Sequence, residues 1–298
     1  MSRILVTGGA GYIGSVLVPM LLNESHEVIV LDNFMYGQNS LLGDCHSPNL
    51  TIISGDSRNE NLVKDVLNRD MDLIIPLACI VGAPACDKDP LLARTTNLDA
   101  IKMLLELRHG YQQIIFPNTN SGYGIGQKDI HCDENTPLNP ISLYGKLKVE
   151  AEKEILKAGN SICLRLATVF GISPRMRLDL LANDLTYKAV NDGYAVLFEA
   201  NFKRNYIHVR DVARAFIHCM ANFGQMNGQA YNVGLSNTNL SKWELCQEIQ
   251  KQIPKFFFIE APLRKDPDQR NYIVSNAKIE ATGFRPMVSI QEGIAEII

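Results

Sequence analysis

A glycine-rich turn at residues 7–14 (TGGAGYIG) joins the first apolar run of the chain to its first amphipathic segment. Gly9, Gly11 and Gly14 fit the pattern G-x-G-x-x-G, and Gly8, Gly11 and Gly14 fit the wider G-x-x-G-x-x-G. Glycines in such a turn let backbone N–H groups approach a pyrophosphate at the positive end of the following helix. A strand that leads through this turn into a helix predicts an α/β fold with a dinucleotide site.

The first two-thirds of the chain alternate short apolar runs with longer amphipathic segments, which is the pattern of β-α-β units and a parallel sheet. The apolar runs predict strands at residues 3–7, 27–31, 50–54, 73–77, 113–116 and 161–165. The segments between them predict helices at residues 13–23, 62–68, 92–108 and 143–158. Because these strands are apolar on both faces, helices should cover both sides of the sheet. We therefore expect a Rossmann-type doubly wound parallel sheet.

The pattern changes after Gly171. Residues 172–201 look mostly helical, a strand is expected at 205–209, and a mixed region rich in Pro, Lys and Asp begins at residue 236. We expect residues 1–170 and 204–235 to form the dinucleotide-binding domain. Residues 171–203 and 236–298 then form a smaller, mixed α/β substrate-binding lobe.

Composition narrows the class of partner. A net charge of -3 offers no basic excess to hold a nucleic acid backbone. No apolar run reaches the roughly 20 residues of a membrane span, and the N-terminus lacks the pattern of a signal peptide. The seven cysteines are dispersed without a C-x-x-C pair, which favours buried free thiols over disulfides or a metal site. These features predict a cytoplasmic protein that binds neither nucleic acid, membrane nor metal.

Asp32 ends the second predicted strand, at the place where a dinucleotide-binding unit presents a carboxylate to the adenosine ribose hydroxyls. A carboxylate there would repel a 2′-phosphate, so NAD is favoured over NADP. The competing interpretation is a solvated carboxylate at a strand end.

Tyr144 and Lys148 are four residues apart at the start of a predicted helix and so share one face. An ammonium near a phenol lowers its pKa from about 10 toward neutrality, which lets the phenolate take a proton from a substrate hydroxyl. The competing interpretation is a solvated helix face. Lys146 is equally basic but points elsewhere.

Together with the glycine turn, this pair resembles the extended short-chain dehydrogenase/reductase family, which includes the nucleotide-sugar epimerases and dehydratases. The resemblance rests on Asp32, Gly55-Asp56, Leu77-Ala78, Thr96-Asn97-Leu98, Tyr144 and Lys148, Leu164-Arg165, Phe170-Gly171 and residues 204–209 (RNYIHV). It places the catalytic hydroxyl on Thr119, with Ser121 as a second candidate. The cofactor contacts that it implies are Gly8, Gly11, Tyr12, Ile13, Gly14, Asp32, Asn33, Asp56, Ser57, Leu77, Ala78, Asn97, Tyr144 and Lys148.

The residues after Thr119 depart from part of that family. Dehydratases resemble one another in carrying Asp-Glu there, and decarboxylases usually carry a Glu, whereas this chain has Asn120 and Ser121. Neither supplies the carboxylate that elimination of water needs. The sequence therefore favours NAD-dependent oxidation at a sugar carbon, C4, by a 4-epimerase or a C4 dehydrogenase. Residues 121–124 and 173–180 resemble a bacterial branch of the family that builds surface-polysaccharide sugars, which implies a role in precursor synthesis. A dehydratase or reductase of the same family and a non-catalytic NAD-binding regulatory protein are the alternatives.

A nucleotide-diphosphate sugar also needs cationic groups, and guanidinium suits a diphosphate. The resemblance favours Arg204, with Arg175, Arg177, Arg264 and Arg270 as further candidates. The expected substrate contacts are Thr119, Asn120, Ser121, Thr168, Arg177, Asn183, Arg204 and Arg270. Relatives dimerise through the helices that correspond to residues 92–108 and 143–158, which implies a homodimer.

Overall fold

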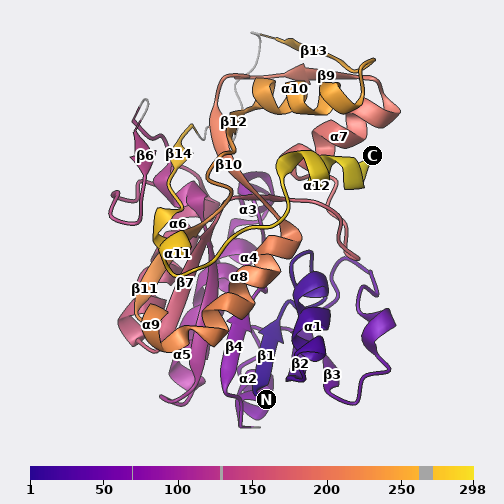
Figure 1. Ribbon diagram of the computed structural model, residues 1–298. Helices are drawn as coiled ribbons and strands as arrows, with labels where there is room; N and C mark the ends of the chain where they lie inside the picture. The colour runs from indigo at the N-terminus through magenta and orange to yellow at the C-terminus, as the bar shows by residue number, and fades with distance from the viewer. Residues whose placement is uncertain (69, 128–129, 262–270) are drawn as a thin grey trace.

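The computed structural model describes residues 1–68, 70–127, 130–261 and 271–298. Its main body is a seven-stranded parallel sheet in the order β11-β7-β5-β4-β1-β2-β3 (Figure 1). These strands are β1 (Arg3–Thr7), β2 (Glu27–Asp32), β3 (Leu50–Ser54), β4 (Leu73–Pro76), β5 (Gln113–Thr119), β7 (Ser161–Leu166) and β11 (Gln229–Val233). The prediction of a doubly wound parallel sheet is confirmed. The strand order reverses beside β1, which places a binding crevice at the carboxyl ends of β1 and β4.

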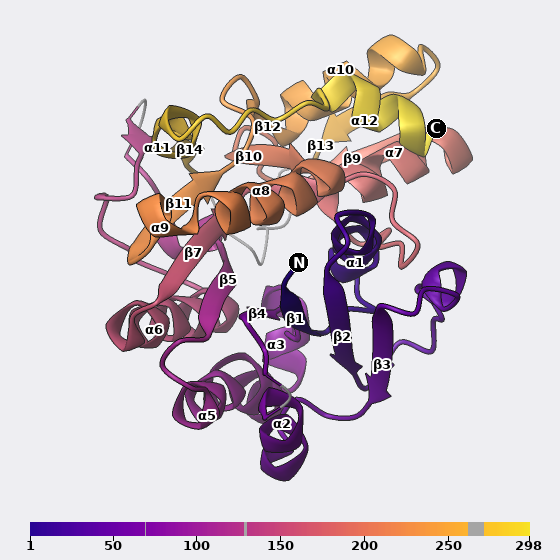
Figure 2. The same cartoon turned by 60° about the horizontal axis from the view of Figure 1, so that its bottom comes forward.

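The two faces of the sheet carry separate apolar cores because successive strand residues point to opposite sides. Ile4 and Val6 pack toward one face, and Leu5 packs toward the other. The first face is covered by α1 (Gly14–Asn23), α8 (Val209–Ala221) and α11 (Ala277–Ala281), and the second by α2 (Glu60–Leu67), α3 (Ala83–Lys88), α5 (Ala100–Leu107) and α6 (Leu143–Ala158). Figure 2 shows α1 and α8 on one side of the strands and α2, α5 and α6 on the other.

The helix expected at residues 92–108 is broken into three parts. A short α4 (Pro90–Arg94) leads into one π-helical turn, η2 (Thr95–Asp99), before α5 begins. A π turn widens the backbone locally and is frequent at functional sites. Here it carries Asn97, whose amide is bonded to the loop after β4.

The smaller lobe has its own core around Phe170, Tyr206 and Leu245. It contains α7 (Leu181–Asn191), α10 (Lys242–Gln252), α12 (Ile290–Ile297) and the parallel pair β9 (Tyr194–Leu197) and β13 (Phe257–Glu260). A three-stranded sheet, β12-β10-β8, joins this lobe to the main body and consists of β8 (Thr168–Phe170), β10 (Lys203–His208) and β12 (Asn239–Ser241). The remaining elements of the described chain are α9 (Phe223–Met226), β6 (His131–Cys132), β14 (Ile273–Val274), η1 (Leu42–Asp44) and η3 (Asn120–Tyr123), which directly follows β5.

The prediction of a mostly helical segment at residues 172–201 is wrong for much of its length. Only α7 is helical; residues 172–180 form a loop, and residues 194–197 form β9 because alternate side chains there are exposed and buried. The strand expected at 205–209 is β10, which pairs with β8 and β12 rather than joining the large sheet. The domain boundaries drawn from the sequence stay a prediction.

Two further observations concern the chain as a whole. None of the helices in the described ranges is both long and apolar enough to cross a membrane. All seven cysteines are free thiols; five are buried, Cys79 is half-buried and Cys45 is exposed.

Candidate active site

The glycine turn is held against the loop that follows β4. Gly8 has a φ of +71°, and a Cβ at this residue would lie 2.5 Å from the backbone nitrogen of Ala78. A Cβ on Gly14 would lie 2.4 Å from the carbonyl oxygen of Gly9. Glycine is therefore required at both positions. The turn leads straight into the N-terminal end of α1, and Ile13 is the last residue before the helix. Free N–H groups and the helix dipole at this end suit a pyrophosphate.

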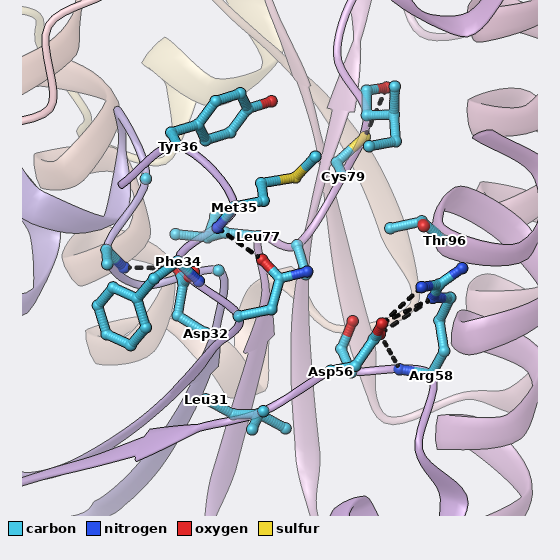
Figure 3. A pocket seen from close by; sticks show the side chains of 18 of the residues that line it. Leu31, Asp32, Phe34, Met35, Tyr36, Asp56, Arg58, Leu77, Cys79 and Thr96 are labelled. Atoms are coloured by element: carbon cyan, nitrogen blue, oxygen red, sulfur yellow. Dashed lines mark hydrogen bonds and ion pairs between the residues drawn. The ribbon is translucent and has the colours of Figure 1, made fainter. Parts of the chain in front are cut away.

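A cleft opens at the carboxyl ends of the central strands, as the reversal of strand order requires (Figure 3). We call it the cofactor cleft. It is lined by the glycine turn, the end of β2 and the segment that follows it (residues 31–36), residues 55–58 after β3, residues 77–80 after β4, and Arg175. Of the predicted cofactor residues, the cleft brings together Gly8, Gly11, Asp32, Asn33, Asp56, Ser57, Leu77 and Ala78.

Asp32 is fixed in the cleft by two backbone donors. Its carboxylate oxygens accept hydrogen bonds from the N–H of Ala10 at 2.9 Å and from the N–H of Phe34 at 2.8 Å. The neighbouring Asn33 accepts from the N–H of Met35 at 3.1 Å. A carboxylate oriented in this way can accept further hydrogen bonds from ribose hydroxyls, because each of its oxygens retains a free lone pair.

The wall opposite is organised by a second carboxylate. Arg58 donates from Nε to both oxygens of Asp56, at 3.0 and 3.1 Å, and from its backbone N–H at 2.9 Å. These hydrogen bonds lower the pKa of Asp56 below its usual value. Arg58 also donates to the Thr95 hydroxyl at 3.2 Å, which ties this wall to the π turn.

Asn97 lies behind the cleft rather than in its lining. Its side chain is buried, accepts from the N–H of Ile80 at 2.8 Å, and donates to the carbonyl of the same residue at 2.8 Å. Asn97 therefore holds the loop that presents Leu77 and Ala78, and it acts on the cleft through that loop.

Tyr144 and Lys148 lie on the first two turns of α6, which the Ser142 side chain caps by accepting from the N–H of Gly145. Lys148 is 4% exposed; its Nζ donates to the carbonyl of Pro117 at 2.5 Å and lies 3.9 Å from the centroid of the Phe116 ring. Burial lowers the pKa of this ammonium, and nearby Cys79, Cys163 and Glu152 oppose that shift. Tyr144 is half-buried, whereas Lys146 points to solvent, as predicted.

The loop that carries the predicted catalytic hydroxyls, Thr119 and Ser121, lies against the same end of α6. Thr119 donates from Oγ1 to the Ser121 hydroxyl at 3.0 Å and accepts from the Ser121 N–H at 3.1 Å. A Cβ on Gly145, next to Tyr144, would lie 3.3 Å from the carbonyl oxygen of Ser121. The fold thus brings the predicted hydroxyl and the Tyr-Lys pair together. Asn120, between Thr119 and Ser121 in the chain, is 1% exposed, and neither polar atom of its amide has a partner in the described protein.

Glu152 and Arg165 form a buried ion pair one helical turn beyond Lys148, which the sequence analysis did not identify. Nη2 of Arg165 donates to Glu152 at 2.7 Å, and the two side chains are 7% and 3% exposed. Asn118, adjacent to Thr119, donates to the same carboxylate at 2.5 Å. Lys148 and Glu152 are four residues apart on α6, a spacing that places Glu152 on the face of the Tyr-Lys pair but gives no signal of its partner on β7.

The loop at residues 172–180 closes the site from the lobe. Although burial lowers it, the pKa of Arg177 is raised overall by the hydrogen bond and charge of Asp179 and by the nearby phenols of Tyr144 and Tyr36.

Tyr12 anchors this loop to the glycine turn. Its hydroxyl donates to the carbonyl of Gly171 at 2.6 Å, and its carbonyl accepts from the Ser173 hydroxyl at 2.7 Å. Asn183 donates to the Tyr12 hydroxyl at 3.3 Å and to the carbonyl of Arg177 at 2.9 Å. Through these contacts, Tyr12 and Asn183 connect the main body to the smaller lobe.

The remaining predicted substrate residues are spread more widely. Thr168 lies on β8, and its buried hydroxyl has no hydrogen-bond partner in the described protein. Arg204 is buried on β10. Arg264 and Arg270 lie outside the described residues.

Comparison with known proteins identifies the family. The sequence matches the NAD dependent epimerase/dehydratase family over residues 4–234. The chain belongs to that family. A UDP-glucose 4-epimerase of Halalkalibacterium halodurans is 28% identical over 329 residues, covering 98% of this chain and 93% of the relative.

Solved structures of this family share the whole fold. A UDP-glucose 4-epimerase of Thermotoga maritima, solved with UDP-glucose, has a TM-score of 0.87 and 25% identity, over 99% of this chain and 97% of that one. A dTDP-glucose 4,6-dehydratase of Streptomyces venezuelae, solved with NAD, has a TM-score of 0.86 and 25% identity, over 99% and 95%. The cofactor of the family is NAD, and the glycine turn and the Asp32 carboxylate fit it. Since epimerases and dehydratases share this fold, the reaction must be inferred from the site.

Proposed function

We propose that the chain is a UDP-hexose 4-epimerase, which oxidises C4 of the sugar and reduces it again on the other face. The observation that carries this proposal is the loop beside Tyr144, where Thr119, Asn120 and Ser121 offer two hydroxyls and an amide but no carboxylate. Elimination of water needs a general acid and a base at the reacting carbons. The similarity to UDP-glucose 4-epimerases supports both the uridine nucleotide and the return of the electrons to the sugar.

The roles of the residues follow from their places. Bound NAD supplies reversible acceptance of a hydride from the sugar carbon. The phenolate of Tyr144 takes the proton of the C4 hydroxyl and later gives it back, and the ammonium of Lys148 stabilises that phenolate. Thr119 holds the same oxygen through its hydroxyl once it exchanges its bond to Ser121 for the substrate.

The diphosphate of the substrate requires cations on the lobe side. We assign it to Arg204, which is buried on β10, and to Arg177, which lies on the same loop as Arg175 of the cleft lining. Thr168 lies on β8, which pairs with β10, and its buried hydroxyl has no hydrogen-bond partner in the described protein. A polar group of the sugar would satisfy it.

The test is incubation of the purified protein with UDP-glucose, UDP-galactose, UDP-N-acetylglucosamine and UDP-glucuronic acid, each in the presence of NAD. Products are separated by anion-exchange chromatography and identified by NMR, while absorbance at 340 nm reports reduced cofactor. We expect one substrate to be converted to its C4 epimer without net NADH. Accumulating NADH would identify a dehydrogenase instead, and a product lighter by one water would identify a dehydratase.

Two pairs of variants test the residues. Tyr144→Phe and Lys148→Met should each lower kcat by at least about a hundredfold, the usual scale for loss of an acid–base group. Their controls are Tyr111→Phe, an exposed tyrosine remote from the cleft, and Lys146→Met, two residues from Lys148 and exposed. If Tyr144→Phe turned over substrate at the rate of the Tyr111→Phe control, Tyr144 would not be the catalytic base.

We further propose that the enzyme acts as a homodimer and supplies sugars for surface polysaccharides, as its sequence resemblance implies, and that it acts in the cytoplasm, as its composition and dispersed cysteines indicate. The outward face of α6 carries Lys146, Glu150 and Lys153, and Glu150 pairs with Lys102 of α5 at 2.9 Å. A dimer built on α5 and α6 would bury charged groups, so its dissociation constant should rise with salt. Light scattering after gel filtration at low and high salt measures this.

A further inference from the structure

Arg175 lies over the N-terminal end of α1, although it belongs to the loop at residues 172–180 of the lobe. Its backbone N–H donates to the hydroxyl of Ser15 at 3.3 Å, in the first turn of that helix. Its side chain lines the cofactor cleft together with Gly11 and Asp32. The guanidinium is therefore beside the end of α1 that suits a pyrophosphate.

The guanidinium is held by stacking rather than by a carboxylate. Its Cζ lies 3.8 Å from the centroid of the Tyr36 ring, and its buried Nε has no hydrogen-bond partner within the described chain. The carboxylate of Asp179, on the same loop, makes its ion pair with Arg177. A buried guanidinium nitrogen without an acceptor is costly unless a ligand supplies one.

The other charges around the cofactor cleft make this cation necessary. Asp32 and Asp56 contribute negative charge to the lining, and Arg58, its other cation, is committed to Asp56. A dinucleotide brings two more negative charges in its diphosphate. The end of a helix offers only about half a positive charge, so it does not balance them alone.

We propose that Arg175 is a cofactor-binding residue, which donates hydrogen bonds to the diphosphate of NAD while Tyr36 supports it by cation–π stacking. Guanidinium suits this role because its planar donors match phosphate oxygens and its face stacks on an aromatic ring. The diphosphate of the nucleotide sugar is then left to Arg177 and Arg204. Because Arg175 and Ser173 lie on one loop, the cofactor fastens the substrate lobe to the glycine turn.

The experiment measures binding by the full-length protein, through the rise of its melting temperature with ligand concentration. The ligands are ADP-ribose, which carries the diphosphate of NAD, adenosine, which carries none, and UDP, which carries that of the substrate. Arg175→Gln should weaken ADP-ribose by about tenfold or more, the scale of a charged hydrogen bond, and leave adenosine and UDP within about twofold. Arg3→Gln is the matched control, since this arginine pairs with Glu27 at the opposite end of β1.

Each alternative outcome contradicts the proposal. Unchanged ADP-ribose affinity would mean that Arg175 does not bind the diphosphate. Weakening of UDP alone would assign the residue to the substrate, and equal weakening of adenosine would show a general disturbance of the cleft. Tyr36→Phe should keep the affinity for ADP-ribose because it retains the ring, whereas Tyr36→Ala should lower it about threefold. Equal behaviour of the two Tyr36 variants would remove the stacking support.

Discussion

The buried ion pair of Glu152 and Arg165, one turn beyond Lys148 on α6, makes a measurable contribution to the free energy of unfolding. Glu152 accepts hydrogen bonds from Nε of Arg165 at 3.2 and 3.1 Å, from Nη2 at 2.7 Å, and from Asn118 at 2.5 Å. The two charged side chains are 3% and 7% exposed, so water cannot replace either partner. Glu152→Gln keeps the shape of the side chain but leaves the guanidinium buried without a counter-charge.

The expected loss in the free energy of unfolding is about 3–5 kcal/mol, the scale for removing one partner of a buried pair. At roughly 2–4 °C per kcal/mol for a chain of this size class, the melting temperature should fall by about 6–20 °C. Urea denaturation followed by circular dichroism at fixed NAD measures the free energy. Glu150→Gln is the matched control on the same helix, because its carboxylate is about half exposed and its pair with Lys102 is worth at most about 1 kcal/mol.

A second arm separates the ion pair from simple packing. Glu152→Met combined with Arg165→Met removes both charges, so it should recover most of the stability lost by Glu152→Gln. The reasoning would be refuted if Glu152→Gln were no more damaging than Glu150→Gln. It would also fail if the double variant were less stable than Glu152→Gln alone, because the cost would then lie in shape and not in the stranded charge.

Four other outcomes follow from the site. Burial lowers the folded-state pKa of Lys148 below its ordinary value of 10.5, so the protonated lysine costs stability at low pH. The free energy of unfolding of the wild type relative to Lys148→Met, measured by urea titration, should therefore rise with pH. A difference between the two proteins that does not change with pH would contradict this. Gly8→Ala forces a side chain into a left-handed backbone against Ala78 and should cost about 1–2 kcal/mol or more, with weaker NAD binding in melting assays. Asn120→Leu removes an unpartnered buried amide and should stabilise the ligand-free protein by about 1 kcal/mol while weakening the nucleotide sugar; a loss of stability would make Asn120 structural. Asp32→Ala should lower the preference for NAD over NADP. If the ratio of the affinities for NAD and NADP stayed the same, the Asp32 carboxylate would not select the cofactor.

The main body of the fold could be predicted because its signals are local. Each strand of the large sheet up to β7 is a short apolar run, and helices α1 and α6 begin and end within a residue of their predicted limits. The glycine turn, Asp32 and the Tyr-Lys pair were found for the same reason, since each is defined by spacing along the chain. Parallel strands then bring their carboxyl ends to one edge of the sheet without further information.

The features that sequence reasoning missed depend on contacts between distant segments. The π turn exists where Asn97 reaches back to Ile80, and periodicity alone predicts one continuous helix there. Residues 172–180 form a loop because their hydrogen bonds go to Tyr12 and Ser15, more than 150 positions earlier in the chain. No local pattern encodes such a partner, so Arg175 was grouped with the substrate residues.

These long-range contacts explain how two binding events can be joined in one site. Tyr12 belongs to the turn that receives the cofactor, yet its hydroxyl is bonded to Gly171, just before the loop at residues 172–180, and its carbonyl is bonded to Ser173 within that loop. Any movement of that loop away from the turn must break two buried hydrogen bonds, and Asn183 adds a third link to the same phenol. A buried donor or acceptor that loses its partner costs free energy, so the lobe that carries Arg177 stays in a fixed position relative to the glycine turn. Hydride transfer between a sugar carbon and NAD needs the reacting atoms about 3–3.5 Å apart in a fixed orientation. The hydrogen bonds through Tyr12 hold the loop and the glycine turn together for that purpose without a large closing motion.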